Sequence, residues 1–513
     1  MFAKVRTIGL NGLDGYIINV EATLLSGLSG IEIVGLPDAS IRESKERVTS
    51  AIKNSGLQFP YGKIILNLSP ANTKKEGATF DLPIAMSILA IMGIINPEKF
   101  NDYCFLGELS LDGKINPIKG ILPMAICASK NKINCLIIPE GNEKEASVIE
   151  NIKILTANNL NDIISYFSNG APLSAPSCNV EEIFSNSKKY DINFSEVKGQ
   201  ETAKRALEIA AAGNHNVLLI GSPGSGKTML AHRIPTILPD LTIEEALEVT
   251  KIYSISGLLS NDFSLLTTRP FRSPHHSVSS VSLVGGGKVP KPGEISLAHN
   301  GVLFLDELPE FQKNALEVLR QPLEDRVITI GRANGIYTYP ANFMFVASMN
   351  PCPCGYYGSI QNSCTCTPKQ IHNYMCKISG PLLDRIDIQL EVPTVKYDEL
   401  NDKLTPESSE KIKERVNKAR EIQLHRFKND NIFSNSQLTA KKINKYCTLD
   451  SDCENILKIA FEKLNLSARA YSRILKVTRT IADLAGSEKI QKSHILEAIQ
   501  YRSLDKRYFG NIS

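Results

Sequence analysis

The stretch GSPGSGKT, residues 221–228, lies directly after the apolar run NVLLI and directly before the helical pattern TMLAHRI. A turn that joins a buried strand to a helix and matches G-x-x-x-x-G-K-[ST] predicts an α/β domain that binds phosphate groups. Its glycines let backbone N–H groups close around the phosphates, Lys227 would reach the β- and γ-phosphates, and the Thr228 hydroxyl would ligate Mg²⁺. The alternative is a chance glycine-rich turn, which requires every position of the pattern to coincide. The predicted nucleotide-binding residues are Gly221, Ser222, Pro223, Gly224, Ser225, Gly226, Lys227 and Thr228.

A second strand signal, GVLFL at 301–305, ends in the acidic pair Asp306 and Glu307. We expect Asp306 to hold Mg²⁺ together with Thr228, and Glu307 to polarise the water that attacks the γ-phosphate. An acidic pair at the end of a strand is also typical of solvated charge at the start of a helix. The upstream phosphate loop favours the catalytic interpretation.

Polar residues further along the chain suit the same reaction. Asn350 ends the strand signal ANFMFVASMN, where an amide can orient the attacking water, although read alone it would be a turn residue. Arg385, in GPLLDRIDI, is a candidate for stabilising γ-phosphate charge on a neighbouring subunit, a contribution of about 10³ to 10⁵ in rate. Arg469 and Arg473 lie one turn apart in an amphipathic helix. Outside this context such arginines are usually solvated or paired with surface acids.

A chain of 513 residues is too long for one hydrophobic core, and its patterns predict three α/β or helical domains. Residues 1–168 alternate strand and helix signals and predict a first α/β domain. Residues 169–191 are rich in Ser, Asn and Pro and read as a linker. Residues 192–397 form the phosphate-binding α/β domain, and residues 398–513, which lack strand signals, predict a helical domain.

Composition sets broad limits on location and partners. No apolar segment is long enough to predict a membrane span, and the opening residues do not resemble a secretory signal, so we expect a cytoplasmic protein. Eleven cysteines, mostly scattered singly, do not suggest a disulfide framework. A net charge of +4 permits binding to nucleic acid but is too small to argue for it.

The segments LFLDE, VASMN, LLDR and SARAYSR follow the phosphate loop in an order that resembles the AAA+ ATPases of the magnesium-chelatase group. The stretches RPFRSPHHSVSSVSLVGGG and NPCPCGYYG extend this to a resemblance to the ComM/YifB family over nearly the whole chain. The resemblance implies an ATP- and Mg²⁺-dependent homohexameric ring that moves branched DNA as a branch-migration helicase in natural transformation and recombination.

The same resemblance assigns roles to residues of this chain. It implies that Asp306 and Glu307 form the Walker B pair, that Asn350 is sensor 1, that Arg385 is the arginine finger and that Arg469 is sensor 2. Two other functions stay open at this point. One is the ATPase subunit of a magnesium chelatase, whose pattern lacks the first domain and the cysteine cluster of this chain. The other is an ATP-dependent protease or protein-remodelling chaperone.

The first 168 residues resemble the proteolytic domain of Lon in KEGATFDLPIA and GELSLDGKINPIKGILPMA. Laid on the Lon pattern, Thr79 takes the place of the nucleophilic serine and Leu122 the place of the lysine base. A leucine cannot accept a proton, so we expect no peptide hydrolysis unless Lys119, three residues away, replaces it. The expected role is packing, ring assembly or partner binding.

Two basic segments are candidates for contacts to DNA in the lumen of such a ring. GGGKVPKPGE carries Lys288 and Lys291, and the predicted hairpin DRVITIGRANGIYTYP carries Arg326 and Arg332. Contacts from these residues to phosphates would tolerate any sequence and weaken with salt. Two ordinary exposed loops explain the same residues equally well.

Metal ligands are suggested at two places. Four thiols in two C-x-C pairs suffice for a tetrahedral Zn²⁺ site, although a reduced cluster without metal and a disulfide stay open. His275 and His276 lack a third ligand at suitable spacing, so we expect them to have a structural role near a ring interface. The thiols are those of Cys352, Cys354, Cys364 and Cys366.

Overall fold

The computed structural model describes residues 2–185, 190–260, 264–287, 290–332, 335–359, 362–395, 397–400, 406–430, 432–464 and 466–509. The chain divides into two compact units. Unit 1 contains Met1–Ser187 and Ala246–Thr267, and unit 2 contains Lys188–Glu245 and Thr268–Ser513. Residues 246–267, which the sequence analysis assigns to the phosphate-binding domain, thus belong to unit 1.

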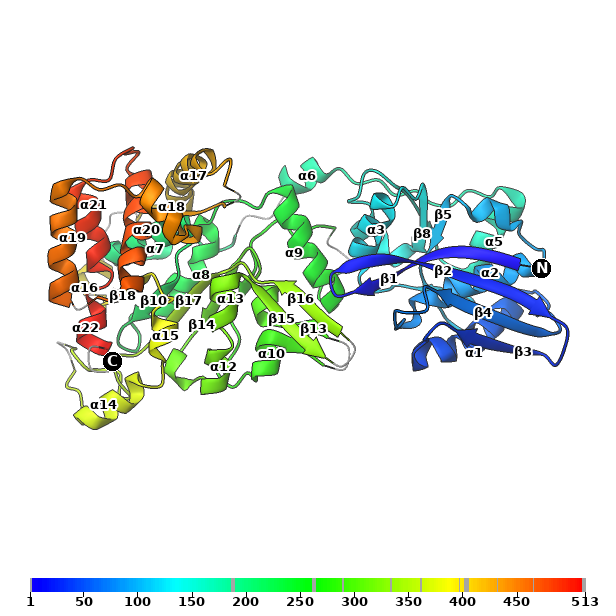
Figure 1. Cartoon of the computed structure of the whole chain (residues 1–513), viewed down its shortest axis with the longest axis horizontal. Helices are drawn as coiled ribbons and strands as arrows, with labels where there is room; N and C mark the ends of the chain where they lie inside the picture. The colour runs from blue at the N-terminus through cyan, green and yellow to red at the C-terminus, as the bar shows by residue number, and fades with distance from the viewer. Residues whose placement is uncertain are drawn as a thin grey trace. The chain divides into compact units, whose positions relative to one another are not determined.

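Unit 1 is built on a mixed sheet of seven strands in the order β3-β4-β2-β1-β5-β8-β9 (Figure 1). Strands β1 and β2 pair antiparallel from Phe2 opposite Thr23 to Asn11 opposite Asp14, and β2 pairs antiparallel with β4. All other neighbours in this sheet are parallel. The strands are β1 (Phe2–Asn11), β2 (Asp14–Leu25), β3 (Gly30–Val34), β4 (Lys63–Ser69), β5 (Tyr103–Phe105), β8 (Cys135–Pro139) and β9 (Lys153–Ala157).

Helices bury apolar clusters against this sheet. Successive side chains of β1 point to opposite faces of the sheet. Val5 therefore packs in the cluster that contains residues of α1, α2 and α5, and Ile8 in the cluster that contains residues of α3. Every residue of α2 is buried, which is the environment that a helix apolar on all sides requires. Its one acid, Asp81, is paired with Arg47 at 2.6 Å. These helices are α1 (Ala39–Asn54), α2 (Asp81–Ile91), α3 (Ile121–Lys130) and α5 (Leu160–Asn169).

One helix, α9 (Ile243–Ser256), begins in unit 2 and continues into unit 1. Within unit 1 the Ser254 hydroxyl donates to Glu145 Oε1 at 2.5 Å, and the same oxygen accepts from Leu122 N at 2.9 Å. Burial raises the pKa of Glu145, and these two donors lower it. Ala246, Val249 and Ile252 of the helix are buried.

Unit 2 contains a parallel sheet of five strands in the order β11-β14-β17-β10-β18. Every residue of β10, β14 and β17 is buried, as expected for parallel strands covered on both faces. Because all the strands run in one direction, their carboxyl ends meet at one edge and their amino ends at the other. The strands are β10 (Val217–Ile220), β11 (Phe271–Arg272), β14 (Val302–Leu305), β17 (Met344–Met349) and β18 (Ile388–Glu391).

The C-terminal part of unit 2 is helical and packs on the sheet domain through α7 (Glu201–Gly213) and α8 (Lys227–Ile237). Helix α17 contacts both, and α20 contacts α7 (Figure 1). Buried side chains of the two parts form one apolar core. Ser467 caps the start of α20, where its hydroxyl accepts a hydrogen bond from Ala470 N. The helices of this part are α17 (Ser409–Arg426), α18 (Ala440–Tyr446), α19 (Ser451–Leu464), α20 (Ala468–Leu484), α21 (Lys492–Gln500) and α22 (Leu504–Phe509).

Shorter elements complete unit 2 around the sheet. They include the hairpin of β15 (Val327–Arg332) and β16 (Gly335–Pro340) and the small ribbon of β12 (Gly285–Gly286) and β13 (Lys291–Pro292). Short helices α13 (Arg320–Asp325), α14 (Pro368–Met375) and α15 (Gly380–Leu383) also belong here. The predicted fold class, α/β with a helical C-terminal part, is confirmed. Within the described ranges, none of the helices is both long and apolar enough to cross a bilayer.

Candidate nucleotide site

The glycine-rich turn joins β10 to α8 at the carboxyl edge of the sheet. Gly224 and Gly226 have φ angles of 75° and 87°, a region that glycine reaches without strain. A Cβ on Gly221 would lie 2.4 Å from the Val392 carbonyl oxygen, so the loop lies close against the chain that leaves β18. The tight path of the loop therefore depends on glycine at these positions.

Lys227 folds its ammonium back into this loop. Its Nζ donates to the carbonyl oxygens of Gly221 and Ser222 at 2.8 and 3.0 Å and to Asn350 Oδ1 at 3.2 Å. The residue is 8% exposed, and burial lowers its pKa while Asp306 and Glu307 raise it. All three contacts are to neutral oxygens, so anionic phosphate oxygens would be stronger partners for the same ammonium.

Asp306, at the end of β14, is bound on both of its oxygens. Thr228 Oγ1 donates to Oδ2 at 2.8 Å, and the Ser348 hydroxyl and Glu307 N donate to Oδ1, the latter at 3.0 Å. Thr228 and Asp306 thus present adjacent oxygens, which are the ligands that Mg²⁺ prefers. Ser348 is a site residue that the sequence motifs do not predict, although its position two residues before Asn350 puts it in the neighbouring strand, β17.

Glu307 adopts a left-handed backbone with φ 54° and ψ 48°, which costs a residue other than glycine about 1–3 kcal/mol. Its carboxylate lies 3.6 Å from His276 Nδ1, and the His276 ring lies 4.0 Å from that of His275. The sequence pattern predicts a structural role for the two histidines and no link with Glu307. No spacing rule joins residues 276 and 307, so only the fold brings them together.

The three candidate arginines lie outside this cluster, on contacts of their own. Arg385 is 6% exposed and binds Glu324 Oε1 at 2.5 Å and the Pro381 carbonyl at 2.5 Å. Arg469 has a 63% exposed side chain and lies 3.4 Å from Asp384 Oδ2. Arg473 is paired with the buried Asp387. Of the two candidates in α20, Arg469 is therefore the more exposed.

The four cysteine thiols converge on one point. Cys352 Sγ lies 3.3 Å from Cys354 Sγ and 3.7 Å from Cys364 Sγ, and all four sulfurs lie within 4.8 Å of one another. Four sulfurs held about 2.3 Å from one ion in a tetrahedron would be about 3.8 Å apart. Donation from the Tyr356 backbone lowers the pKa of Cys354 to about 5, which favours a thiolate. The cluster, completed by Cys366, thus fits a metal ion.

This cysteine loop touches the phosphate loop. Gly355 has a φ of 86°, and a Cβ on it would lie 2.5 Å from Cδ and 2.7 Å from Cγ of Pro223. The loop also begins immediately after Asn350, whose side chain binds Lys227. The cluster that the sequence places beside the site is therefore in contact with it.

The predicted DNA-contacting residues separate into two places. Lys291 is exposed and pairs through its backbone with Gly286, and a Cβ on Gly286 would lie 2.9 Å from Arg332 Nη2. Arg332 and Lys291 are thus neighbours. Arg326 instead turns away, donating to Asn342 Oδ1 at 2.8 Å. Lys288 lies outside the described residues.

Neither of the two Lon-like positions in unit 1 holds a residue that can act as a base. Leu122 is fully buried in α3, and Thr79 lies in a short 3₁₀ turn, Ala78–Phe80. The side chain of Lys119 packs against Gly257, where a Cβ would lie 2.8 Å from Nζ. Lys119 is thus engaged by the segment that follows α9.

Comparison with known proteins gives consistent similarities along the chain. Residues 193–400 match the family described as magnesium chelatase, subunit ChlI, residues 406–502 match its C-terminal part, and residues 20–142 match subunit ChlI of Mg-chelatase. Competence protein ComM of Haemophilus influenzae is 43% identical over 497 residues, 96% of both chains. The uncharacterized protein YifB of Escherichia coli is 43% identical over 503 residues, 98% of this chain and 97% of that one. Lon protease of Trichlorobacter lovleyi is 22% identical over 184 residues, 34% of this chain and 22% of that one.

Proposed function

Because this chain belongs to the ComM/YifB family of magnesium-chelatase-like AAA+ proteins, we propose that it is an ATP-driven ring motor that remodels branched DNA. The observation that best supports ATP hydrolysis is the meeting of Lys227, Thr228, Asp306 and Asn350 through direct hydrogen bonds at one edge of the sheet. The name of the Haemophilus relative, a competence protein, supports DNA as the substrate.

In this proposal each residue exchanges a present contact for a phosphate, metal or water. ATP supplies the phosphoanhydride bond, and Mg²⁺ supplies positive charge next to it. Lys227 would leave the loop carbonyls and bind phosphate oxygens, while Thr228 and Asp306 would hold the ion. Glu307 accepts the proton of the attacking water, and Asn350 orients that water. His276, 3.6 Å from Glu307, holds the carboxylate in place before the substrate binds.

Ring assembly would complete the site. AAA+ proteins usually act as oligomers, and we propose a homohexamer in which Arg385 or Arg469 stabilises the γ-phosphate of a neighbouring subunit. The exposed side chain of Arg469 supports a role across an interface. Arg385 would first have to leave Glu324, whose side chain is 51% exposed.

DNA would contact the neighbouring pair Lys291 and Arg332. Both residues are exposed, and they come from two separate short ribbons. A pair of cations at the tips of two ribbons suits contacts to successive phosphates of any sequence. Each substitution to Gln is expected to weaken binding to DNA and to reduce its dependence on salt, which a titration at two salt concentrations would measure.

The cysteine cluster is proposed to hold Zn²⁺. The convergence of four sulfurs within 4.8 Å of one another supports a metal site, and four thiolates are a common ligand set for structural zinc. Metal analysis should find one zinc per chain in the parent protein and none after Cys364→Ser and Cys366→Ser. Equal zinc in both proteins would show that the thiols are not the ligands.

One experiment tests the central proposal. The parent protein should drive ATP-dependent migration of a synthetic three-stranded junction, and Lys227→Ala should not. ATP hydrolysis that DNA does not stimulate, without movement of the junction, would leave an ATPase but refute the DNA motor. ATP-dependent degradation of casein would instead favour the protease alternative.

A further inference from the structure

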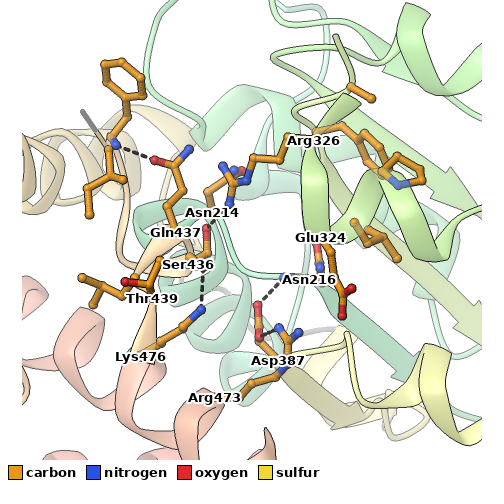
Figure 2. A pocket seen from close by; sticks show the side chains of 17 residues that line it. Asn214, Asn216, Glu324, Arg326, Asp387, Ser436, Gln437, Thr439, Arg473 and Lys476 are labelled. Carbon is orange, nitrogen blue, oxygen red and sulfur yellow. Dashed lines mark hydrogen bonds and ion pairs between the residues drawn. The ribbon is translucent and has the colours of Figure 1, made fainter. Parts of the chain in front are cut away.

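A polar cavity in unit 2 is lined by residues at the amino ends of the sheet strands (Figure 2). Its walls include Asn216 just before β10, Phe343 just before β17 and Asp387 just before β18, which are the amino ends of these strands. The helical part closes it with residues of α20 and of the segment 432–439. The volume open to a ligand is about 440 Å³, enough for a small molecule.

Two cations enter this cavity without a carboxylate partner. Lys476 Nζ donates to the Ser436 carbonyl at 2.9 Å, and Arg326 Nη2 lies 3.4 Å from the hydroxyl of the same residue. Within the described ranges, neither side chain forms an ion pair with a carboxylate. Figure 2 shows Arg326 and Lys476 on either side of Ser436. Two like charges thus converge on one neutral residue.

The acids of the cavity are already engaged. Asp387 is paired with Arg473, lies 3.3 Å from His215 Nδ1 and accepts from Asn216 N at 3.1 Å. Glu324 binds Arg385 at 2.5 Å. Both carboxylates thus already have partners, and the three lining cations, Arg326, Arg473 and Lys476, outnumber them, so the cavity keeps an excess of positive charge.

The pKa values of Arg326 and Lys476 both show the cost of burying a positive charge in this cavity. Burial lowers the pKa of Arg326 to about 10 and the pKa of Lys476 to about 8. Asp387 raises the pKa of Lys476, whereas Arg473 and Arg326 lower it. An anion between the two cations would remove this cost.

The rest of the cavity wall, beyond Arg326 and Lys476, combines apolar and polar side chains. Among the lining residues Phe433 is 59% exposed, whereas Phe343 is 7% exposed and Leu438 is 2% exposed. Thr439 and Gln437 add a hydroxyl and an amide group to the same wall. A ligand that has a compact anionic group and a flat ring system would match both ends, because an exposed aromatic ring is a stacking surface.

We propose that this cavity is a second nucleotide site, which binds a phosphate group between Arg326 and Lys476 and a base against Phe433. The phosphate can belong to a free nucleotide or to the end of a DNA strand, since both present the same group. The site is separate from the phosphate loop and does not depend on ATP hydrolysis there.

Calorimetric titration of the full chain tests the site, with Lys227→Ala as background so that the phosphate loop contributes little. Inorganic pyrophosphate and AMP should each bind at one site per chain. Lys476→Met should weaken both by at least about tenfold, since a charged hydrogen bond is lost. Phe433→Ala should weaken AMP but leave pyrophosphate unchanged.

Two control variants guard against general effects. Lys418→Met removes an exposed lysine of α17 that is paired with Glu414, and it should leave both affinities unchanged. Lys476→Arg keeps the charge and should retain binding. Failure of pyrophosphate and AMP to bind, or equal affinities in the Lys476→Met protein, would overturn the proposal.

A competition experiment distinguishes the two sources of the phosphate. A 5′-phosphorylated oligonucleotide that displaces pyrophosphate, when its unphosphorylated twin does not, would support the proposed site as one for strand ends. Displacement by AMP alone would support it as a site for free nucleotides. Equal displacement by the phosphorylated and unphosphorylated oligonucleotides would contradict it, because a terminal phosphate would then not be what the site recognises.

Discussion

The two edges of the five-stranded sheet each hold a shielded lysine, but they are built differently. At the carboxyl edge, Lys227 binds three neutral oxygens of its own loop and of Asn350, beside the acids Asp306 and Glu307. At the amino edge, Lys476 binds one carbonyl oxygen and faces Arg326. At the first edge two acids act on the lysine, whereas at the second Asp387 acts on it together with two further cations, Arg473 and Arg326.

The difference shows which kind of site can be predicted from a sequence. The phosphate loop is one continuous stretch, because a single turn supplies the backbone donors and the lysine together. The cavity at the amino edge is assembled from residues between Asn214 and Lys476 in several separate elements, and no spacing links them. A contiguous motif predicts a site, and a site assembled by the fold requires the structure.

The largest expected effect is at the carboxyl edge. Lys227→Ala should lower ATP hydrolysis by at least about 10² to 10³-fold, since a preorganised cation beside the phosphates is lost. Glu307→Gln should retain ATP binding and lose hydrolysis to a similar extent, trapping an ATP-bound ring. Steady-state hydrolysis and nucleotide retention measure the two outcomes, and hydrolysis at the parental rate in Glu307→Gln would show that the assigned base is wrong.

The next effect concerns the stability of the amino edge. Burial raises the pKa of Asp387, but Arg473 and His215 lower it well below its ordinary value, so the carboxylate is charged in the folded protein. Asp387→Asn would leave Arg473 without its partner and should lower the free energy of unfolding by about 3 kcal/mol. Urea unfolding measures this change. Glu324→Gln, which breaks a half-exposed pair, should cost less than about 1 kcal/mol.

A smaller effect should link the cysteine loop to the phosphate loop. Gly355→Ala would press a methyl group on Pro223 and strain a positive φ, so ATP hydrolysis should fall by about tenfold while the fold is kept. Gly486→Ala is the matched control, because its φ is 64° and a Cβ there would meet nothing within 4 Å. Equal activities of the two variants would separate the cysteine loop from the nucleotide site.

The smallest expected effect has the opposite sign. The pKa of Lys476 is lowered from 10.5 to about 8, so the unfolded chain binds more protons than the folded protein between these values. Lys476 therefore destabilises the protein below pH 8, and stability should rise as the pH increases from 8 to 10. Lys476→Met should stabilise the protein by on the order of 1–2 kcal/mol at pH 7 and flatten this rise. Thermal unfolding at several pH values would reveal the opposite if Lys476 stabilises the ligand-free fold.

The fold class and the carboxyl edge were predictable for local reasons. Apolar strands such as 217–220 and 302–305 are followed by their polar residues within a few positions, so Lys227 and Asp306 could be placed before the structure was known. The contact of His276 with Glu307 and the turn of Arg326 toward the helical part could not, because both depend on how distant segments pack. The same holds for the passage of α9 into unit 1.

That passage has a topological consequence. Unit 1 is formed by two separate stretches of the chain, Met1–Ser187 and Ala246–Thr267, and the intervening stretch Lys188–Glu245 belongs to unit 2. The chain therefore passes between the two units three times. A fragment that starts at residue 188 would carry Ala246, Val249 and Ile252 without the surroundings that bury them. A preparation of unit 2 alone would expose these apolar residues and aggregate, unless residues 246–267 were removed as well.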